Sequence, residues 1–523
     1  MKDIKLIDLN SIETAPAKVA PANYDWLKIV KVAENAVRFG VWEIVIKNLP
    51  DGTRIIKNNH VSLNGLFAIL DNAGFAKRYR PDGTYILIRV KENILTVAKP
   101  AQIKDYIIDL VETLPETISV QGFELTKESL KETFLAQHHI LFGENTLSPL
   151  KNNTSEMLSD TPNEMYFPYL NTVVKVTRSG VELLPYSELK NLCIWDSHII
   201  QRTFQISDSK AMYEDFIINV CSEDSERIRA MRAAFGYAMH RYYNASNTRA
   251  IVLYDEQITD SNSANGGTGK SLAAVALSKM RETETIDGKK FNANERFSLQ
   301  RVTDSTEIAF FDDILPDFQF ERFNSILTNG WETEQKNKTA LRIELEHSPK
   351  MIIASNSIMK TLDGNTASRR QYILEFGNYY SSLIATIPEP IVHVHGCTFF
   401  RDWSNAEWNA FDNYMVKSCI DYLANGLPLQ KTKNVEYNRL LQNTSEDFVN
   451  WVTEKNFLES ISGHQNDYHF PQNYIEFKSL YYGESSQWSS ATFGKWLKLY
   501  AKTNGFIYET KKFNTVTYFY FKK

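Results

Sequence analysis

The chain has 523 residues, a formal net charge of -5 and 43% hydrophobic residues, which is ordinary for a folded protein of about three domains. Its four cysteines are far apart and form no C-x-x-C pair, so neither a disulfide framework nor a zinc module is predicted. No segment approaches the roughly eighteen apolar residues that cross a bilayer, and the N-terminus lacks a signal-peptide core. We therefore expect a cytoplasmic protein without a membrane partner, in which any nucleic-acid binding depends on local basic patches.

Hydrophobic periodicity divides the chain into segments of different character. Short mixed strands and helices in the first two hundred residues predict an α+β region without a recognisable motif. Two amphipathic helices follow, and then strands alternate with helices as in a parallel sheet. The predicted divisions are a flexible leader (1–25), an N-terminal α+β domain of unknown role (26–205), a helical segment (206–247), an α/β core (248–380), a helical extension and linker (381–435), and a C-terminal module of helices and two strands (436–523).

A glycine-rich loop lies between a predicted buried strand at 250–254 and a predicted helix at 272–279. Glycine allows backbone N–H groups to surround phosphates, a following lysine reaches the β- and γ-phosphates, and a serine hydroxyl can coordinate Mg²⁺. The usual pattern begins with glycine, where this chain has Ala264. The residues predicted to bind ATP are Asn265, Gly266, Gly267, Thr268, Gly269, Lys270 and Ser271, with Ser271 also a metal ligand.

Polar residues end two further predicted strands downstream of this loop. The apolar strand at 308–311 leads into Asp312 and Asp313, and the strand at 350–354 leads to Asn356. We expect Asp312 to hold Mg²⁺ and Asp313 to act as general base on the attacking water. Asn356 is expected to sense the γ-phosphate or position that water. The acidic residues between the first strand and the loop would repel a triphosphate, so we expect that insert to bulge away.

The loop, the acids and the terminal asparagine lie within 92 residues, from Asn265 to Asn356. In this the chain resembles the superfamily 3 helicases, AAA+ ring motors of small viruses, phages and plasmids. It looks like the helicase part of phage and plasmid primase-helicases, with the resemblance strong over about residues 205 to 380. The resemblance implies an AAA+ P-loop NTPase core at 248–380.

The resemblance also implies roles for two later segments. Residues 331–345 are predicted to form two strands around a polar turn, and such a hairpin carries DNA-contacting lysines, here Lys336 and Lys338. The pair Arg369 and Arg370 begins thirteen residues after Asn356. At this place the family has a catalytic arginine that reaches the neighbouring subunit's γ-phosphate. Either arginine of the pair fits this role.

The C-terminal module is basic in a chain that is acidic overall. Residues 495–523 contain seven lysines and one acid, a net charge of +6, with aromatic residues between them. Helices followed by a two-stranded wing are typical of a winged-helix domain, which binds DNA or protein. Phosphate neutralisation and base stacking favour DNA, and the predicted contacts are Lys495, Lys498, Lys511 and Lys512.

Together the motifs and the resemblance imply a replicative DNA helicase that hydrolyses ATP with Mg²⁺ in a phage, plasmid or other mobile element. It would translocate on single-stranded or forked DNA as a homo-hexameric ring, beside a separate primase or polymerase, in the cytoplasm of a bacterial cell or phage-infected host. One alternative is a replication initiator or loader that uses ATP as a switch without processive unwinding. Another is an ATPase of a mobile-element or phage-defence system.

Overall fold

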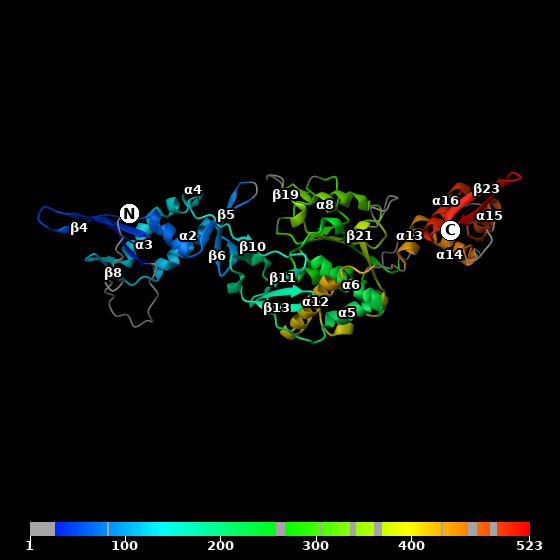
Figure 1. Cartoon of the computed structure of the whole chain (residues 1–523), viewed down its shortest axis with the longest axis horizontal. Coiled ribbons are helices and arrows are strands. Elements are labelled where there is room, and N and C mark those ends of the chain that lie inside the picture. Colours follow the sequence, from blue (N-terminus) through cyan, green and yellow to red (C-terminus); the bar gives the residue numbers. More distant parts are fainter. Residues whose placement is uncertain are drawn as a thin grey trace. The chain divides into compact units, whose positions relative to one another are not determined.

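The structure is a computed structural model that describes residues 27–80, 83–257, 267–295, 297–303, 305–334, 341–359, 369–429, 432, 434–458, 468–481 and 489–522. It confirms a mixed α/β class (Figure 1). The chain forms two compact units, one made of Met1–Leu158 with Leu184–Ile199 and the other of Ser159–Leu183 with Ile200–Lys523. Within the described ranges, no helix has the length and apolar character needed to cross a membrane.

The first unit has two main sheets and a buried apolar core. One sheet has the order β1-β2-β3-β4 and the other the order β10-β14-β7-β6-β5, while β8 and β9 form a separate hairpin. Trp42 is fully buried in the core, and its indole N–H donates to the Leu130 carbonyl at 3.0 Å. The elements are β1 (Ile29–Ala33), β2 (Ala36–Phe39), β3 (Trp42–Asn48), β4 (Arg54–Val61), α1 (Leu63–Asn72), β5 (Phe75–Tyr79), β6 (Tyr85–Lys91), β7 (Ile94–Val97), α2 (Pro100–Glu112), β8 (Thr117–Val120), β9 (Phe123–Thr126), α3 (Lys127–Leu141), α4 (Glu144–Leu147), β10 (Glu156–Met157) and β14 (Leu192–Trp195).

The second unit is built on a five-stranded parallel sheet of order β16-β17-β20-β15-β21. Every residue of β15 and β20 is buried, as expected for strands covered on both faces. The first strand of this sheet in the chain, β15, therefore lies between the fourth and the fifth. The sheet strands are β15 (Ala250–Asp255), β16 (Thr283–Asp287), β17 (Ile308–Asp312), β20 (Lys350–Ala354) and β21 (Gln371–Phe376).

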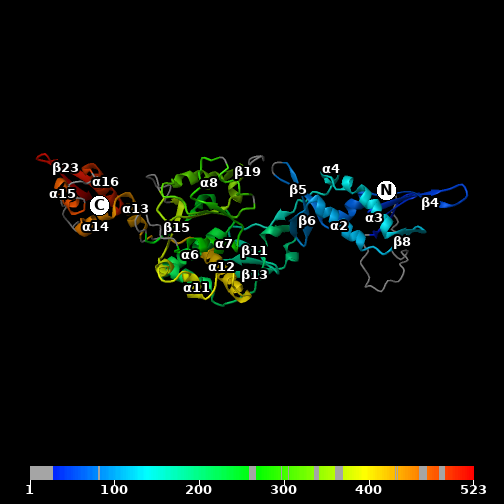
Figure 2. The ribbon, with the colours of Figure 1, turned by 180° about the vertical axis from the view of Figure 1, so that it is seen from behind.

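Helices cover the two faces of this sheet, as Figures 1 and 2 show for α6 and α12 on one side and α8 on the other. Side chains alternate along β15, so that Ile251 and Leu253 face the first layer while Val252 and Tyr254 face the second. The remaining helices and strands of this part are α5 (Met212–Val220), α6 (Ser225–Met239), α7 (Lys270–Ser278), α8 (Asn324–Asn329), β18 (Trp331–Thr333), β19 (Leu341–Ile343), α10 (Tyr379–Leu383), α11 (Pro390–His395) and α12 (Asn405–Asn425).

A three-stranded sheet that precedes these helices also belongs to the second unit. It consists of β11 (Glu164–Pro168), β12 (Val173–Thr177) and β13 (Gly180–Leu184). Its buried residues Phe167 and Val174 join the same apolar cluster as α6 and α12. The boundary predicted at residue 205 does not coincide with the division into units, because the periodicity of short strands does not reveal which core they join.

The C-terminal module has its own apolar core, in which Phe448, Trp451 and Phe493 are buried. Helices and strands follow in the order α13 (Val435–Asn443), α14 (Glu446–Lys455), β22 (Tyr468–His469), α15 (Phe470–Tyr481), α16 (Ser490–Thr503), β23 (Ile507–Phe513) and β24 (Val516–Lys522). The strands pair in the order β22-β24-β23. The two-stranded hairpin predicted at the C-terminus is confirmed, and Asn514 and Thr515 at its tip have left-handed φ angles of 48° and 70°.

Candidate nucleotide-binding site

The glycine-rich loop connects the carboxyl end of β15 to the first residue of α7, which is Lys270. Gly267 and Gly269 have φ angles of 92° and 104°, a region that other residues rarely adopt. A Cβ atom on Gly269 would lie 2.7 Å from the Phe216 ring. The local fold therefore requires glycine at position 269 for both conformation and space. Asn265 and Gly266 lie outside the described residues.

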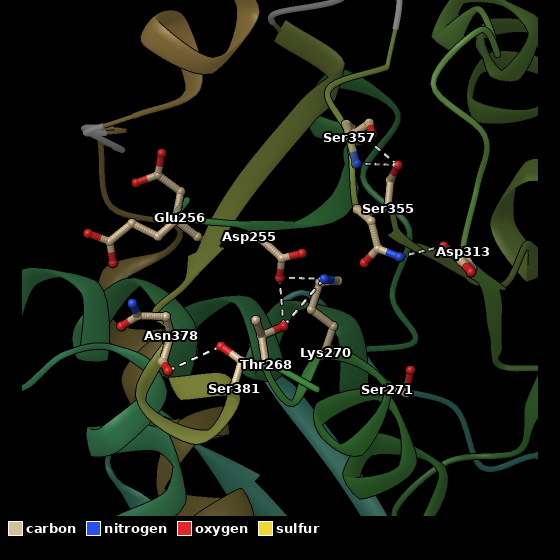
Figure 3. Close-up of polar contacts among 12 residues, drawn as sticks. Asp255, Glu256, Thr268, Lys270, Ser271, Asp313, Ser355, Ser357, Asn378 and Ser381 are labelled. Atoms are coloured by element: carbon tan, nitrogen blue, oxygen red, sulfur yellow. Dashed lines mark hydrogen bonds and ion pairs between the residues drawn. The ribbon is translucent and has the colours of Figure 1, made fainter. Parts of the chain in front are cut away.

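Lys270 contacts an acidic side chain at the end of β15 (Figure 3). Its ammonium forms an ion pair with the Asp255 carboxylate and lies 3.3 Å from the Thr268 hydroxyl. The Thr268 hydroxyl donates to the same Asp255 oxygen at 2.6 Å. Lys270, Asp255 and Thr268 are 7%, 5% and 4% exposed. They form a buried polar cluster at the base of the loop.

This cluster corrects the expectation that the acids before the loop bulge away. Asp255 is the last residue of β15 and points to Lys270, and the Glu256 carboxylate forms an ion pair with Arg227 at 2.6 Å. The Glu256 backbone N–H continues the sheet pairing by donating to the Phe376 carbonyl at 2.8 Å. Each of these two acids has a basic partner, which offsets the cost of removing the Asp255 carboxylate, and part of the Glu256 carboxylate, from water. The later acid of the insert, Asp260, lies outside the described residues.

Ser271 and Asp312 come together across the carboxyl edge of the sheet. The Ser271 hydroxyl donates to Asp312 Oδ1 at 3.1 Å. Burial raises the pKa of the Asp312 carboxyl above its ordinary value, although the hydrogen bond from Ser271 acts in the opposite direction. A hydroxyl and a carboxylate so placed fit Mg²⁺, which takes few protein ligands and completes its shell with water and substrate phosphates. No cluster of three or more His, Cys, Asp or Glu residues that could hold a metal occurs in the described ranges.

Asp313 follows at the same edge and has a left-handed φ angle of 63°. The Asn356 amide, from the segment after β20, donates to Asp313 Oδ1 at 2.9 Å. The Lys289 ammonium, from the turn after β16, lies 2.5 Å from Asp313 Oδ2. Each carboxylate oxygen has a second lone pair, so Asp313 can still accept a hydrogen bond from a water molecule. The structure thus brings the predicted base and the predicted asparagine into direct contact.

Lys289 was not identified from the sequence. The hydrogen bond to Asp313 raises the pKa of Lys289, which keeps the ammonium charged. It is preceded by Gly288, where a Cβ atom would lie only 2.6 Å from the Asp312 carbonyl oxygen. The sequence signal for Lys289 was its position, with Gly288, directly after a strand. The carboxyl ends of parallel strands lie on one side of the sheet, so a lysine at this position lies near the other site residues.

The arginine pair lies at the amino ends of the strands of this sheet, opposite the carboxyl ends where the other site residues meet. Arg370 immediately precedes β21, and its guanidinium donates to the Thr248 hydroxyl, just before β15, at 3.3 Å. Since β15 and β21 are parallel with Ala250 opposite Gln371, the glycine-rich loop begins about 16 Å further along the strands. Neither Arg369 nor Arg370 therefore reaches Lys270 within one chain.

The predicted DNA contacts are only partly within the described residues. Strands β18 and β19 pair antiparallel as expected, but Lys336 and Lys338, which the sequence predicts at the tip of this hairpin, lie outside the described residues. Lys495 and Lys498 are exposed on one face of α16, and Lys502, four residues after Lys498, adds a third exposed lysine to that face. The lysines predicted on the wing, Lys511 and Lys512, are exposed on β23.

Phe513, one of the aromatic residues that the sequence places among the lysines of this module, ends β23 and is 65% exposed. It lies beside the left-handed turn of the β23–β24 hairpin. Alternation along a strand predicts that every second aromatic residue is buried, as Phe519 and Phe521 are on β24. Phe513 pairs with Val516 at the turn end of the hairpin, several residues away from Phe519 and Phe521. Only the register of the hairpin shows that it lies outside this buried group.

No protein-family model matches the chain, and no curated protein does. Among solved structures, the chain is similar to the A-form apo structure of the NrS-1 C-terminal region, at 11% identity and a TM-score of 0.39, over 87% of this chain and 98% of that chain. A second A-form apo structure of that region gives 10% identity and a TM-score of 0.38, over 88% and 99%. TM-scores under 0.5 assign neither a fold nor a function, so the site residues must support the function.

Proposed function

We propose that the second unit is a Mg²⁺-dependent ATPase of the AAA+ class and that the protein is a replicative DNA helicase. The single observation that carries the ATPase proposal is the convergence of Lys270, Ser271, Asp312, Asp313 and Asn356 at one edge of a parallel sheet. Of the strands that follow β15 in the chain, β16, β17 and β20 lie on one side of it and β21 lies on the other. The loop at the carboxyl end of β15 therefore lies at a switch point of the sheet. Ligands of open α/β sheets bind at such a point, outside the carboxyl ends of the strands.

The proposed reaction is the transfer of the γ-phosphoryl group of ATP to water. Bound Mg²⁺ would neutralise charge on the β- and γ-phosphates, and Ser271 and Asp312 are the residues that would hold it. Lys270 would bind the phosphates, and Asp313 would accept the proton of the attacking water. Asn356 and Lys289 both orient the Asp313 carboxylate, so they would fix the direction from which water attacks.

Assembly into a ring follows from the resemblance and from the position of the arginine pair. Because Arg369 and Arg370 lie at the amino ends of the strands, away from the loop, either of them could complete such a site only from another subunit. A positive charge supplied in this way stabilises the charge of the transition state and makes hydrolysis depend on assembly. We therefore propose a homo-oligomer, hexameric as in the family it resembles, in a phage, plasmid or other mobile element.

DNA binding is proposed for two places. The β18–β19 hairpin would contact the backbone of single-stranded DNA through Lys336 and Lys338. The C-terminal module has the element order of a winged helix, with α16 as the helix that meets DNA and the β23–β24 hairpin as the wing. The lysine face of α16 would neutralise phosphates, and the exposed Phe513 on the wing would stack on a base.

Hydrolysis and strand displacement, measured on the same preparations, test this function. The full chain should hydrolyse ATP and displace a strand from a forked duplex, while Lys270→Ala should do neither. Lys336→Ala/Lys338→Ala should hydrolyse ATP without DNA but lose stimulation by DNA and strand displacement. Hydrolysis without displacement by the wild-type chain would instead support an ATP-switched initiator or loader. Failure of the wild-type chain to hydrolyse ATP would contradict the ATPase assignment.

A further inference from the structure

We propose that Asp255 competes with the triphosphate for Lys270 and thereby sets the affinity of the site for nucleotide. The proposal rests on the proposed ATPase function and concerns the regulation of the same site. It assigns a role to an acid that the usual phosphate-loop chemistry does not require. Its basis is the buried cluster of Asp255, Thr268 and Lys270 (Figure 3).

The backbone fixes the position of the Asp255 carboxylate. Asp255 is the last residue of the interior strand β15 and pairs with Phe376 of β21. Its side chain is only 6% exposed, and the Lys270 side chain 8%. A carboxylate at this depth has little access to water and depends on its cationic and hydrogen-bonding partners. If the Lys270 ammonium moved fully onto the phosphates, Asp255 would lose this ion pair and keep the hydrogen bond from the Thr268 hydroxyl.

The phosphates themselves would meet the same carboxylate. Lys270 is the residue that should reach the β- and γ-phosphates, and its ammonium contacts Asp255, so phosphate oxygens bound to it lie within a few ångströms of a negative charge. A like charge disfavours a charged group, and an opposite charge at similar distance shifts a carboxyl by about 1 to 3 pKa units, so an effect of the same size on phosphate binding would be a factor of roughly 10 to 1,000. Asp255 thus weakens the affinity, and a weaker affinity favours release and exchange of nucleotide in each cycle.

Replacing the charge while keeping the shape separates this role from a structural one. Asp255→Asn keeps an oxygen that can accept from Thr268 but removes the charge that competes with the phosphates. We expect the full chain with this substitution to bind ATP in the presence of Mg²⁺ about tenfold more tightly by calorimetry. Its melting temperature without nucleotide should fall, because Lys270 loses its ion-pair partner, and the increase produced by ATP should be larger than in the wild type.

Asp412 provides a matched control. It is also a buried aspartate with a basic partner, Arg202, and it belongs to α12 rather than to the loop. Asp412→Asn should lower the melting temperature without changing the Kd for ATP. If Asp255→Asn does not fold, Asp255→Ser removes the same charge with a smaller side chain that can still accept from Thr268.

The outcomes separate the two proposals. If wild type and Asp255→Asn bind ATP with equal Kd, or the variant binds more weakly, competition by Asp255 is refuted while the ATPase proposal stands. If neither protein binds ATP, the proposed function fails and the inference falls with it. Tighter binding by Asp412→Asn as well would show a general effect of destabilisation and would also refute the specific role of Asp255.

Discussion

The proposed role of Asp313 can be tested by Asp313→Asn, which removes its basicity and keeps its shape. Asparagine retains an oxygen that can accept from the Asn356 amide, now 2.9 Å from Asp313 Oδ1. The ion pair with Lys289 is lost, but the Lys289 side chain is 62% exposed, so solvent already screens it and its loss should cost at most about 1 kcal/mol. A domain of this size then melts about 2 to 4 °C lower, and the variant stays folded.

The catalytic effect should be far larger than the effect on stability. A positioned general base contributes about 10² to 10⁴ in rate, so kcat for ATP should fall by that factor while the Kd for nucleotide changes less than about threefold. Steady-state phosphate release gives kcat, and calorimetry gives Kd. Asp317→Asn, at an exposed position in the following turn, is the control and should change neither. Retention of hydrolysis within about threefold would refute the role of Asp313 as base, and a parallel loss of binding would assign it to nucleotide recognition.

Four further predictions concern other residues. Lys289→Ala should lower kcat roughly tenfold, with Kd unchanged, because Asn356 still orients the base; an unchanged kcat would show that Lys289 is only a surface partner. Mixing Arg370→Ala with Lys270→Ala chains should restore hydrolysis above either alone, whereas simple additivity would refute a shared site. Phe513→Ser should weaken binding to forked DNA about tenfold in a fluorescence titration and leave DNA-independent hydrolysis intact; equal affinity would remove the wing from the interface. Burial lowers the pKa of Lys350 from 10.5 to about 7, so between these pH values the unfolded chain binds more protons and the free energy of unfolding should rise with pH. Lys350→Met should abolish this rise, as measured by chemical denaturation at several pH values. Parallel curves of unfolding free energy against pH for the two proteins would contradict the prediction.

The polar residues of the site were predictable because each one ends or begins a strongly patterned element. Asp312, Asp313 and Asn356 follow apolar strands, and Lys270 starts a helix after a glycine-rich loop. In a parallel sheet the carboxyl ends of the strands lie at one edge, so residues in these positions meet whatever the exact order of the strands. The sequence therefore predicts the composition of the site without predicting its contacts.

The contacts that distinguish this site depend on the tertiary structure. Nothing in the local sequence pairs Asp255 with Lys270 fifteen residues later, or Lys289 with Asp313, because such pairs depend on strand order and on the direction of each side chain. The acids before the loop, counted as charges, predict that this insert bulges away, whereas ion pairs hold Asp255 beside Lys270 and Glu256 beside Arg227.

The sequence by itself determined that the chain carries a glycine-rich loop between a strand and a helix, and two acids and an asparagine after apolar strands, because residue type and hydrophobic period act locally. Only the tertiary structure decided that β15 lies between β20 and β21, that the arginine pair lies at the amino ends of the strands, and that Asp255 forms an ion pair with Lys270. These depend on which apolar faces pack together, and many strand orders satisfy the same alternation of strands and helices along the chain.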